Sequence, residues 1–296
     1  MRTNNSEVFY AGIDGGGTHC RVRIESASGQ LLGQGIGGTA NPSHGLSTVI
    51  QSIMTAFKEA LKQATISEEQ LGQFIVGAGL AGLHLPRYLT MMQSWQHPFQ
   101  AICYTDDLHV ATIGAHAGGD GAVVIVGTGF SALSLVDGIK TAVGGYGFLQ
   151  ADHCSGSWLG YQAVQMALLS HDGYTEPGLL SELLSQHFNA SGYQLADKLA
   201  DAGARDYGAI APLVFNAAEQ GDMVAQQLLN DSCQFIARTI EILQKTNPPK
   251  IALIGGVAEQ LIPLLPAKLT EHLSAPIQTA EQGAISFAKQ KQIITT

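Results

Sequence analysis

The chain of 296 residues is long for a single domain and comfortable for two. Hydrophobic residues make up 45% of the chain and charged residues only 13%, so we expect a large packed interior under a modest polar shell. The formal charge of −9 argues against a nucleic acid or an anionic membrane as partner, because both select basic surfaces. Backbone amides can still bind phosphate groups in an acidic protein.

Neither a targeting segment nor a membrane span is predicted. The residues Met1 to Ser6 are polar, and no apolar run approaches the length that crosses a bilayer. The four cysteines are scattered, without a CxxC pair or a zinc spacing, which favours reduced thiols in a cytoplasmic protein. They are Cys20, Cys103, Cys154 and Cys233.

The first elements are predicted as strand, glycine turn, strand, turn and strand. Val8 to Asp14 is typical of a buried strand, and Gly15-Gly16-Gly17-Thr18 follows it at once. Apolar and polar residues then alternate from Cys20 to Glu25, which indicates a half-buried strand. The third strand is expected over 31–36.

Alternating α/β structure is expected next. The spacing of apolar residues predicts helices over 46–64, 88–95 and 108–116, and strands over 74–79 and 100–104.

A second strand, glycine turn and strand unit begins at Gly121. A strand to Val126 leads into Gly127-Thr128-Gly129, then a strand over 132–136, a hairpin turn at Asp137-Gly138 and a third strand from Thr141. The matching order indicates an internal duplication that makes two facing lobes, although two glycine-rich hairpins could also agree by chance. The remainder is predicted to be mostly helical, over 157–170, 179–187, 193–200, 208–220, 223–246 and 282–289, with a strand at 251–254.

The two glycine turns are candidate phosphate loops, because glycine lets backbone amides approach a phosphate closely. The first turn lacks the lysine and the following helix of a P-loop, and it lacks the helix that a Rossmann turn requires. An ordinary tight turn is the competing interpretation of each.

Three carboxylates stand at predicted strand ends. Asp14 could hold Mg²⁺ beside a phosphate or simply cap its turn. Of Asp106 and Asp107, one could cap the following helix and the other could accept a proton from an attacking hydroxyl. The pattern alone does not separate these two.

Further loop candidates follow other strands. They are Asn41-Pro42, the glycine-rich run 144–147, the segment 152–156 before a helix, and Gly255-Gly256. Each competes with ordinary loop structure. His109, His116 and His153 are expected to be structural rather than metal ligands.

In combination these motifs resemble the BadF/BadG/BcrA/BcrD-type ATPase family, within the actin-like superfamily of sugar kinases. The resemblance runs essentially end to end, and bacterial glucosamine kinases and N-acetylglucosamine kinases are the most similar members. The motifs that carry it are the stretches 14–18, Asp107-Leu108-His109, 113–116, 127–129, 144–160 and 254–256, together with Trp95-Gln96-His97-Pro98-Phe99.

The resemblance implies an α/β fold of two ribonuclease-H-like lobes facing a central cleft, with ATP and an amino sugar as ligands. The lobes would be residues 1–116 with the helix 282–296, and residues 117–281. Asp107 would be the catalytic base and Asp14 the Mg²⁺ residue. The sugar would contact Asn41, Asp107, Gly145, Asp152 and Gly156. The nucleotide would contact Gly15, Gly16, Gly17, Thr18, Gly127, Thr128, Gly129, Gly255 and Gly256.

Some positions depart from the family pattern. His19 replaces a common lysine, Phe130 a common serine, and His153-Cys154 a common Glu-Gly pair. Two rival functions therefore stay open: an ATPase that activates a 2-hydroxyacyl-CoA dehydratase through an iron–sulfur cluster, and a sensor without turnover. The choice between glucosamine and N-acetylglucosamine is also left open, and the resemblance is compatible with a homodimer.

Overall fold

The computed structural model describes residues 8–295, and the chain divides into two compact units. The first lobe is the described chain up to Asp120 together with the segment that starts at Ala275. The second lobe is the continuous segment from Gly121 to Ser274. Each lobe contains one mixed sheet and its own hydrophobic core.

The sheet of the first lobe has five strands in the order β3-β2-β1-β4-β5. Neighbours among the first three are antiparallel, whereas β1, β4 and β5 are parallel to one another. Because β1, β4 and β5 are parallel, their carboxyl ends lie along the same side of the sheet. The strands are β1 (Phe9–Gly15), β2 (Cys20–Glu25), β3 (Leu31–Gly37), β4 (Phe74–Leu80) and β5 (Ala101–Thr105).

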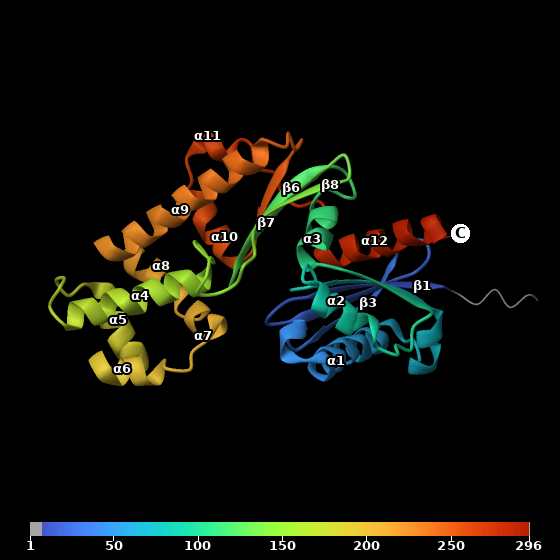
Figure 1. Ribbon diagram of the computed structural model, residues 1–296, viewed down its shortest axis with the longest axis horizontal. Helices are drawn as coiled ribbons and strands as arrows, with labels where there is room; N and C mark the ends of the chain where they lie inside the picture. Colours follow the sequence, from blue (N-terminus) through green and yellow to red (C-terminus); the bar gives the residue numbers. More distant parts are fainter. Residues whose placement is uncertain (1–7, 296) are drawn as a thin grey trace, which may run out of the picture. The chain divides into compact units, whose positions relative to one another are not determined.

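Helix α1 (Leu46–Ala64) covers one face of this sheet, and α12 (Ala280–Thr295) with α3 (Asp107–Ala115) covers the other (Figure 1). The apolar residues of α1 recur every four positions, and Phe57 of this helix packs edge-on against Phe74 of β4. Burying such a side chain contributes about 1.5–3 kcal/mol. The shorter elements are η1 (Pro42–His44), η2 (Glu68–Gln73) and α2 (Pro86–Gln93).

Helix α12 lies unusually close to the sheet. A Cβ added at Gly12 of β1 would overlap the backbone carbonyl of Glu281, and one at Gly77 of β4 would overlap that of Ala284. Glycine at these strand positions therefore lets the last helix pack directly on the backbone. This contact places the first turn of α12 beside β1.

The second lobe repeats the strand order of the first with one strand fewer. Its order is β8-β7-β6-β9, in which β6 pairs antiparallel with β7 and parallel with β9, as β1 does with β2 and β4. This agrees with the matching units expected from the sequence. The strands are β6 (Gly121–Val126), β7 (Phe130–Val136), β8 (Ile139–Gly144) and β9 (Ile251–Ile254).

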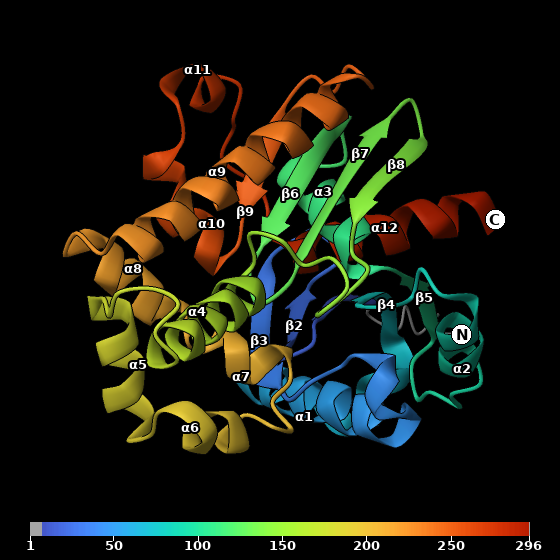
Figure 2. The same cartoon turned by 60° about the vertical axis from the view of Figure 1, so that its left-hand side comes forward.

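Helices supply most of the second lobe. The long helix α9 packs its apolar side against β6 and β7, and Figure 2 shows it running beside these strands. The helices are α4 (Gly156–His171), α5 (Leu179–Phe188), α6 (Gly192–Lys198), α7 (Ala204–Gly208), α8 (Ala211–Glu219), α9 (Met223–Gln244), α10 (Gly256–Leu261), η3 (Ile262–Leu264) and α11 (Ala267–Thr270).

The expected α/β class, with a related sheet in each lobe, is confirmed. The short helix α7, which ends at Gly208, was not predicted. The helix predicted over 208–220 is found as α8 but begins three residues later than predicted, at Ala211, with Pro212 in its first turn, where a missing N–H is tolerated. Helix α2 starts two residues earlier than predicted, at Pro86, for the same reason. Within residues 8–295, no helix combines the length and apolar character of a membrane span.

Candidate active site

Two clusters of the predicted residues form, one in each lobe. In the first lobe, strand register sets Asp14 beside Gly79 and Gly79 beside Thr105. The segments that leave β1, β4 and β5 therefore meet at one edge, and the three acids Asp14, Asp106 and Asp107 gather there. We call this group the carboxylate edge.

Asp106 and Asp107 have different local roles. Asp106 is the N-cap of α3, and its Oδ1 accepts the backbone N–H of His109 at 2.8 Å. Asp107 is the first helical residue, and its Oδ1 lies 2.9 Å from the N–H of Leu108. The capping role that the sequence left open thus falls to Asp106, which leaves Asp107 as the candidate base.

The electrostatic surroundings of Asp107 favour proton uptake. Burial, followed by the negative charges of Asp14 and Asp106, raises the pKa of this carboxyl to about 7, against the opposing effect of the backbone N–H groups of Leu108 and Asp107. A carboxylate that titrates near neutral pH is matched to general-base catalysis. The unused His109 ring is held by Thr105, whose Oγ1 is 2.9 Å from its Nδ1.

Asp14 shares this environment. Burial and the nearby charge of Glu281 raise its pKa to about 6, while Arg21, whose Nη1 lies 3.5 Å from Oδ2, opposes the shift. Glu281 raises the pKa of Asp14, and Asp14 in turn raises that of Asp107, so the negative charge gathered here is one that a cation would relieve. Because Mg²⁺ commonly takes one or two protein carboxylates and otherwise water and phosphate oxygens, these residues fit the ion. Among the described residues, no group of three or more Asp, Glu, His or Cys side chains is placed to hold a metal ion by itself.

The first glycine turn is closed by backbone bonds. The N–H of Gly16 donates to the carbonyl of His19 at 2.9 Å, and the carbonyl of Gly16 accepts from Ala40 at 3.1 Å. A Cβ at Gly17 would meet nothing within 4 Å, so this face of the turn is open. Across the described residues, the N–H groups of Gly17 and Thr18 donate to no other backbone group. They are therefore available to an anion.

Asn41 lies next to this turn. Its Oδ1 accepts the N–H of Ser43 at 2.9 Å and caps η1, and a Cβ at Gly82, just after β4, would be 3.5 Å from that oxygen. The predicted sugar residue Asn41 thus stands near the ends of β1 and β4, with its oxygen already engaged.

The second cluster forms around Gly127-Thr128-Gly129 in the other lobe. The N–H of Gly127 donates to the carbonyl of Gly129 at 3.0 Å. The start of α4 holds the turn from outside, because Gly156 donates to Gly127 at 2.8 Å and Ser157 to Thr128 at 3.0 Å. The amide of Gly156, predicted to contact sugar, is therefore used in bracing the turn.

Asp152 and Gly145 join the same cluster through Phe130. Asp152 Oδ1 accepts the N–H of Phe130 at 3.4 Å, and the carbonyl of Phe130 accepts from Gly145 at 3.1 Å. Burial raises the pKa of Asp152, and the Phe130 N–H opposes that shift.

Gly255 approaches the turn from β9. Its φ is +112°, and a Cβ there would overlap the carbonyl of Val126, so only glycine fits. Gly256 begins α10 beside it, and a Cβ at that position would meet nothing within 4 Å. The second glycine turn is thus enclosed by α4 on one side and by Gly255 on the other.

The four departures from the family pattern have local explanations. His19 is exposed and supplies only its carbonyl to the turn. Phe130 is a core residue whose ring packs edge-on against Phe235, and its backbone still serves the turn. His153 is stacked on Phe235, and Cys154 is buried.

Sequence reasoning missed three neighbours of these clusters. Arg21 alternates outward along β2 like any exposed strand residue, and only pairing with β1 shows that it faces Asp14. Glu281 comes from the far end of the chain, and no local pattern connects it with Asp14. A Cβ at Gly208, the last residue of α7, would be 3.1 Å from the Thr128 methyl group, and the sequence did not predict α7.

Comparison with known proteins places this arrangement among sugar kinases and related ATPases. The chain is 32% identical to the glucosamine kinase GspK of Vibrio cholerae, over 95% of each chain. It is 25% identical to the N-acetyl-D-glucosamine kinase of Dictyostelium discoideum, over 90% of this chain and 92% of that one. A solved structure of a presumed N-acetylglucosamine kinase from Chromobacterium violaceum superposes with a TM-score of 0.89 at 28% identity, covering 96% of this chain and 99% of that one.

The family profile of the BadF/BadG/BcrA/BcrD ATPases matches residues 11–287, which include every glycine turn and acid described above. The chain belongs to the BadF/BadG/BcrA/BcrD ATPase family.

Proposed function

We propose that this protein is an ATP-dependent kinase that phosphorylates the 6-hydroxyl of an amino sugar, glucosamine or N-acetylglucosamine. The observation that carries the proposal is Asp107, a partly buried carboxyl at the start of α3 whose pKa is raised to about 7 while its neighbour Asp106 caps the helix. Such a group is suited to accept a hydroxyl proton near neutral pH.

In this proposal Asp107 accepts the proton of the 6-hydroxyl as that oxygen attacks the γ-phosphorus of ATP. The hydroxyl O–H bond breaks, a new O–P bond forms, and the bond from the γ-phosphorus to the β-phosphate oxygen breaks to release ADP. General-base catalysis of this kind contributes about 10²–10⁴-fold to the rate.

The glycine turns are assigned to the phosphates. Free amides at Gly17 and Thr18, and the braced turn at Gly127-Thr128-Gly129, supply the preorganised donors that stabilise developing negative charge. Gly255 and Gly256 are assigned to the nucleotide. When bound, Mg²⁺ would neutralise charge on the phosphate oxygens, and Asp14 is the residue that we expect to hold it.

The sugar is assigned to Asn41, Gly145, Asp152 and Gly156. Asp152 is buried and accepts one long hydrogen bond, of 3.4 Å, so an oxygen of its carboxylate remains for a sugar hydroxyl. Gly156 would act through the position of the turn, because its amide is already engaged. The free or acetylated state of the amine depends on few contacts, and the two relatives named above differ in this respect.

The rival electron-activating function requires cysteine thiolates. Burial raises the pKa of all four thiols, including Cys103 and Cys154. Cys20, Cys154 and Cys233 are buried and only Cys103 is partly exposed, so the chain presents no exposed pair of thiols for a cluster shared between two copies, which favours the kinase over this rival.

The decisive experiment measures ADP release with MgATP and glucosamine, N-acetylglucosamine, glucose or no sugar. We expect turnover that requires one of the amino sugars, and the preferred sugar identifies the substrate. ATP hydrolysis that ignores sugar would contradict the kinase in favour of the activating ATPase. Sugar binding without turnover would instead indicate a sensor.

A further inference from the structure

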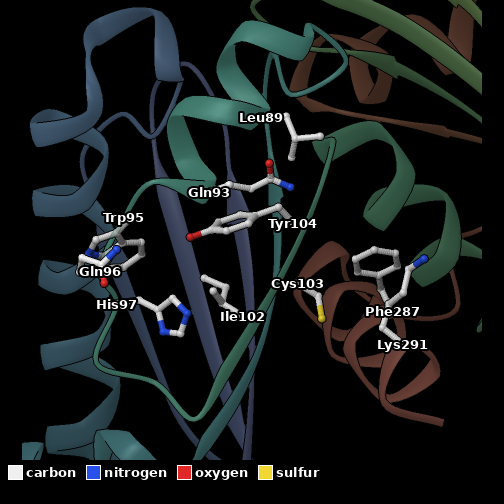
Figure 3. Close-up of a pocket in the computed structure, with 10 residues that line it drawn as sticks. All are labelled: Leu89, Gln93, Trp95, Gln96, His97, Ile102, Cys103, Tyr104, Phe287 and Lys291. Carbon is white, nitrogen blue, oxygen red and sulfur yellow. The ribbon is translucent and has the colours of Figure 1, made fainter. Parts of the chain in front are cut away.

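A pocket of about 620 Å³ opens in the first lobe beside β5. We call it the edge pocket and define it by Leu89, Gln93, His97, Cys103, Tyr104 and Lys291, which are drawn in Figure 3. Its size is in the range of small-molecule sites. None of the residues assigned to ATP or the sugar lines it.

The pocket is built around β5, the last strand of its sheet. Side chains alternate along a strand, so Ile102 and Tyr104 lie toward the α2 side while Cys103 points toward α12 (Figure 3). Helix α12 contributes Phe287 and Lys291, and the Lys291 Nζ lies 5.6 Å from the centre of the Phe287 ring. The α12 side of the pocket is therefore both aromatic and cationic.

Two buried polar atoms in this wall lack partners. Among the described residues, the hydroxyl of Tyr104 and the Nδ1 of His97 have neither a hydrogen-bond partner nor measurable exposure. Most buried polar atoms in proteins are paired, and leaving one unpaired is unfavourable. Both atoms belong to residues that line the same pocket. Their shared location indicates that a partner is missing there.

The charge of the pocket is opposite to that of the chain. The formal net charge is −9, yet no acidic side chain is among the residues that line the pocket, whereas Lys291 and His97 are. The amides of Gln93 and Gln96 add donors and acceptors, and both side chains belong to exposed residues. A ligand that matches this lining carries an anionic group and several hydroxyls.

We propose that the edge pocket binds a small phosphorylated sugar, with the phosphate toward Lys291 and the hydroxyls toward Tyr104, His97 and the two glutamine amides. The ligand class follows from the lining and not from the proposed kinase activity. Binding would satisfy the two unpaired atoms after a small side-chain movement, and would do so without any residue of the carboxylate edge.

Cys103 provides a reporter inside the pocket. It is partly exposed, whereas Cys20, Cys154 and Cys233 are buried. Alkylation by iodoacetamide at about pH 8.5, followed by peptide mass spectrometry, measures access to this thiol. We expect glucosamine 6-phosphate and glucose 6-phosphate to protect Cys103 saturably. This readout requires no turnover, so it stands or fails separately from the proposed function.

Substitutions of residues that line the edge pocket test whether the ligand protects Cys103 by binding there. Lys291→Gln should raise the half-protecting concentration about tenfold, and Tyr104→Phe about three- to tenfold. Tyr104→Phe should leave the unfolding temperature of the unligated protein unchanged or higher, because it removes an unpaired hydroxyl.

Two control substitutions lie outside the pocket. They are Lys289→Gln, at a lysine whose Nζ is 4.5 Å from the Tyr10 ring centre, and Tyr88→Phe, at a tyrosine whose hydroxyl accepts from Arg87. Both should behave as the wild type does.

Three results would overturn the proposal. Protection that persists undiminished in both pocket variants would place the ligand elsewhere. Equal protection by inorganic phosphate would show simple anion binding. Protection that grows with protein concentration in the absence of ligand would show that a second copy covers the edge of β5, as exposed strand edges allow.

Discussion

The two glycine turns stand at equivalent places in two sheets of the same strand order, but different groups surround them. In the first lobe the turn after β1 adjoins Asp14, Asp106 and Asp107, and the pKa values of Asp14 and Asp107 are raised. In the second lobe the turn after β6 is fixed by backbone bonds from Gly156 and Ser157 and by the close approach of Gly255. The same strand arrangement thus surrounds its glycine turn with acidic side chains in the first lobe and with closely packed backbone in the second.

This difference suggests a division of labour. Carboxylates can move protons and attract a cation, so their effect depends on pH. Backbone amides do not titrate in this pH range, and they bind an anion only where no side chain blocks its approach, so their contribution depends on glycine at these positions. Substitutions should therefore affect chemistry in the first lobe and geometry in the second.

The largest expected effect is that of Asp107→Asn. Loss of the base should lower kcat by about 10²–10⁴-fold and leave sugar binding measurable by calorimetry. Asp106→Asn is the matched control, because it changes the neighbouring acid that caps α3, and we expect its kcat to stay much closer to the wild-type value. Equal losses in the two variants would refute the separation of their roles.

The pH dependence of activity tests the same acid. With a pKa of about 7, Asp107 is increasingly protonated as the pH falls, so kcat/KM should decline about tenfold per unit below that value. A profile that is flat down to pH 5 in the wild type would show that no group with this pKa is required.

The stability of the protein should change with pH in the opposite sense. The folded pKa of Asp107 is raised above its ordinary 3.8, so the folded state binds the proton more tightly between these values and loses stability as the pH rises through the window. Asp107→Asn lacks this titration. Measured without Mg²⁺, the unfolding temperature of the variant minus that of the wild type should therefore increase from pH 4 to pH 7 and keep its higher value above pH 7. A constant difference would argue against the raised pKa.

Geometry in the second lobe is tested by Gly255→Ala. The added Cβ would overlap the Val126 carbonyl in a backbone conformation with φ of +112°, so we expect a loss of about 1–3 kcal/mol in the free energy of unfolding and a raised KM for ATP. Gly256→Ala is the control, because a Cβ there meets nothing within 4 Å. Denaturant unfolding and kinetics of both variants would check the contrast, which equal stabilities would contradict.

The smallest effects are expected at the helix caps next to the two turns. Asp106→Ala removes the N-cap of α3, and Ser155→Ala removes the N-cap of α4, whose hydroxyl accepts from Trp158 at 3.2 Å. Each should lower the free energy of unfolding by about 0.5–2 kcal/mol. The Ser155 variant should also raise the KM for ATP slightly, because α4 braces the second turn. An unchanged unfolding midpoint would show that the cap contributes little.

Much of the fold could be predicted from local patterns. Helix α1 has the same bounds as its apolar spacing predicts, and β2 follows its alternation, because each has one face toward a single core. The short helix α7 was not predicted, and the start of α8 was placed three residues too early, since apolar residues continue across Ala209 and Ile210 and give no local sign of the boundary.

The candidate site could be predicted only in part. Glycine turns and strand-end acids are local signals, so the sequence predicts both turns, Asp14 and the pair Asp106 and Asp107 as candidates. The separation of Asp106 from Asp107 required the capping bond, and the contribution of Glu281 required a contact between the two ends of the chain. Long-range contacts of this kind leave no periodicity in the sequence.

The return of α12 to the first lobe has a consequence for biosynthesis. The ribosome releases β1 to β5 early, but the helix that packs on Gly12 and Gly77 emerges last. The second lobe is continuous in sequence and can complete its core while the first still exposes one face of its sheet. A nascent chain stalled before Ala280 should therefore bind chaperones through that uncovered face, and synthesis of the last helix should release it.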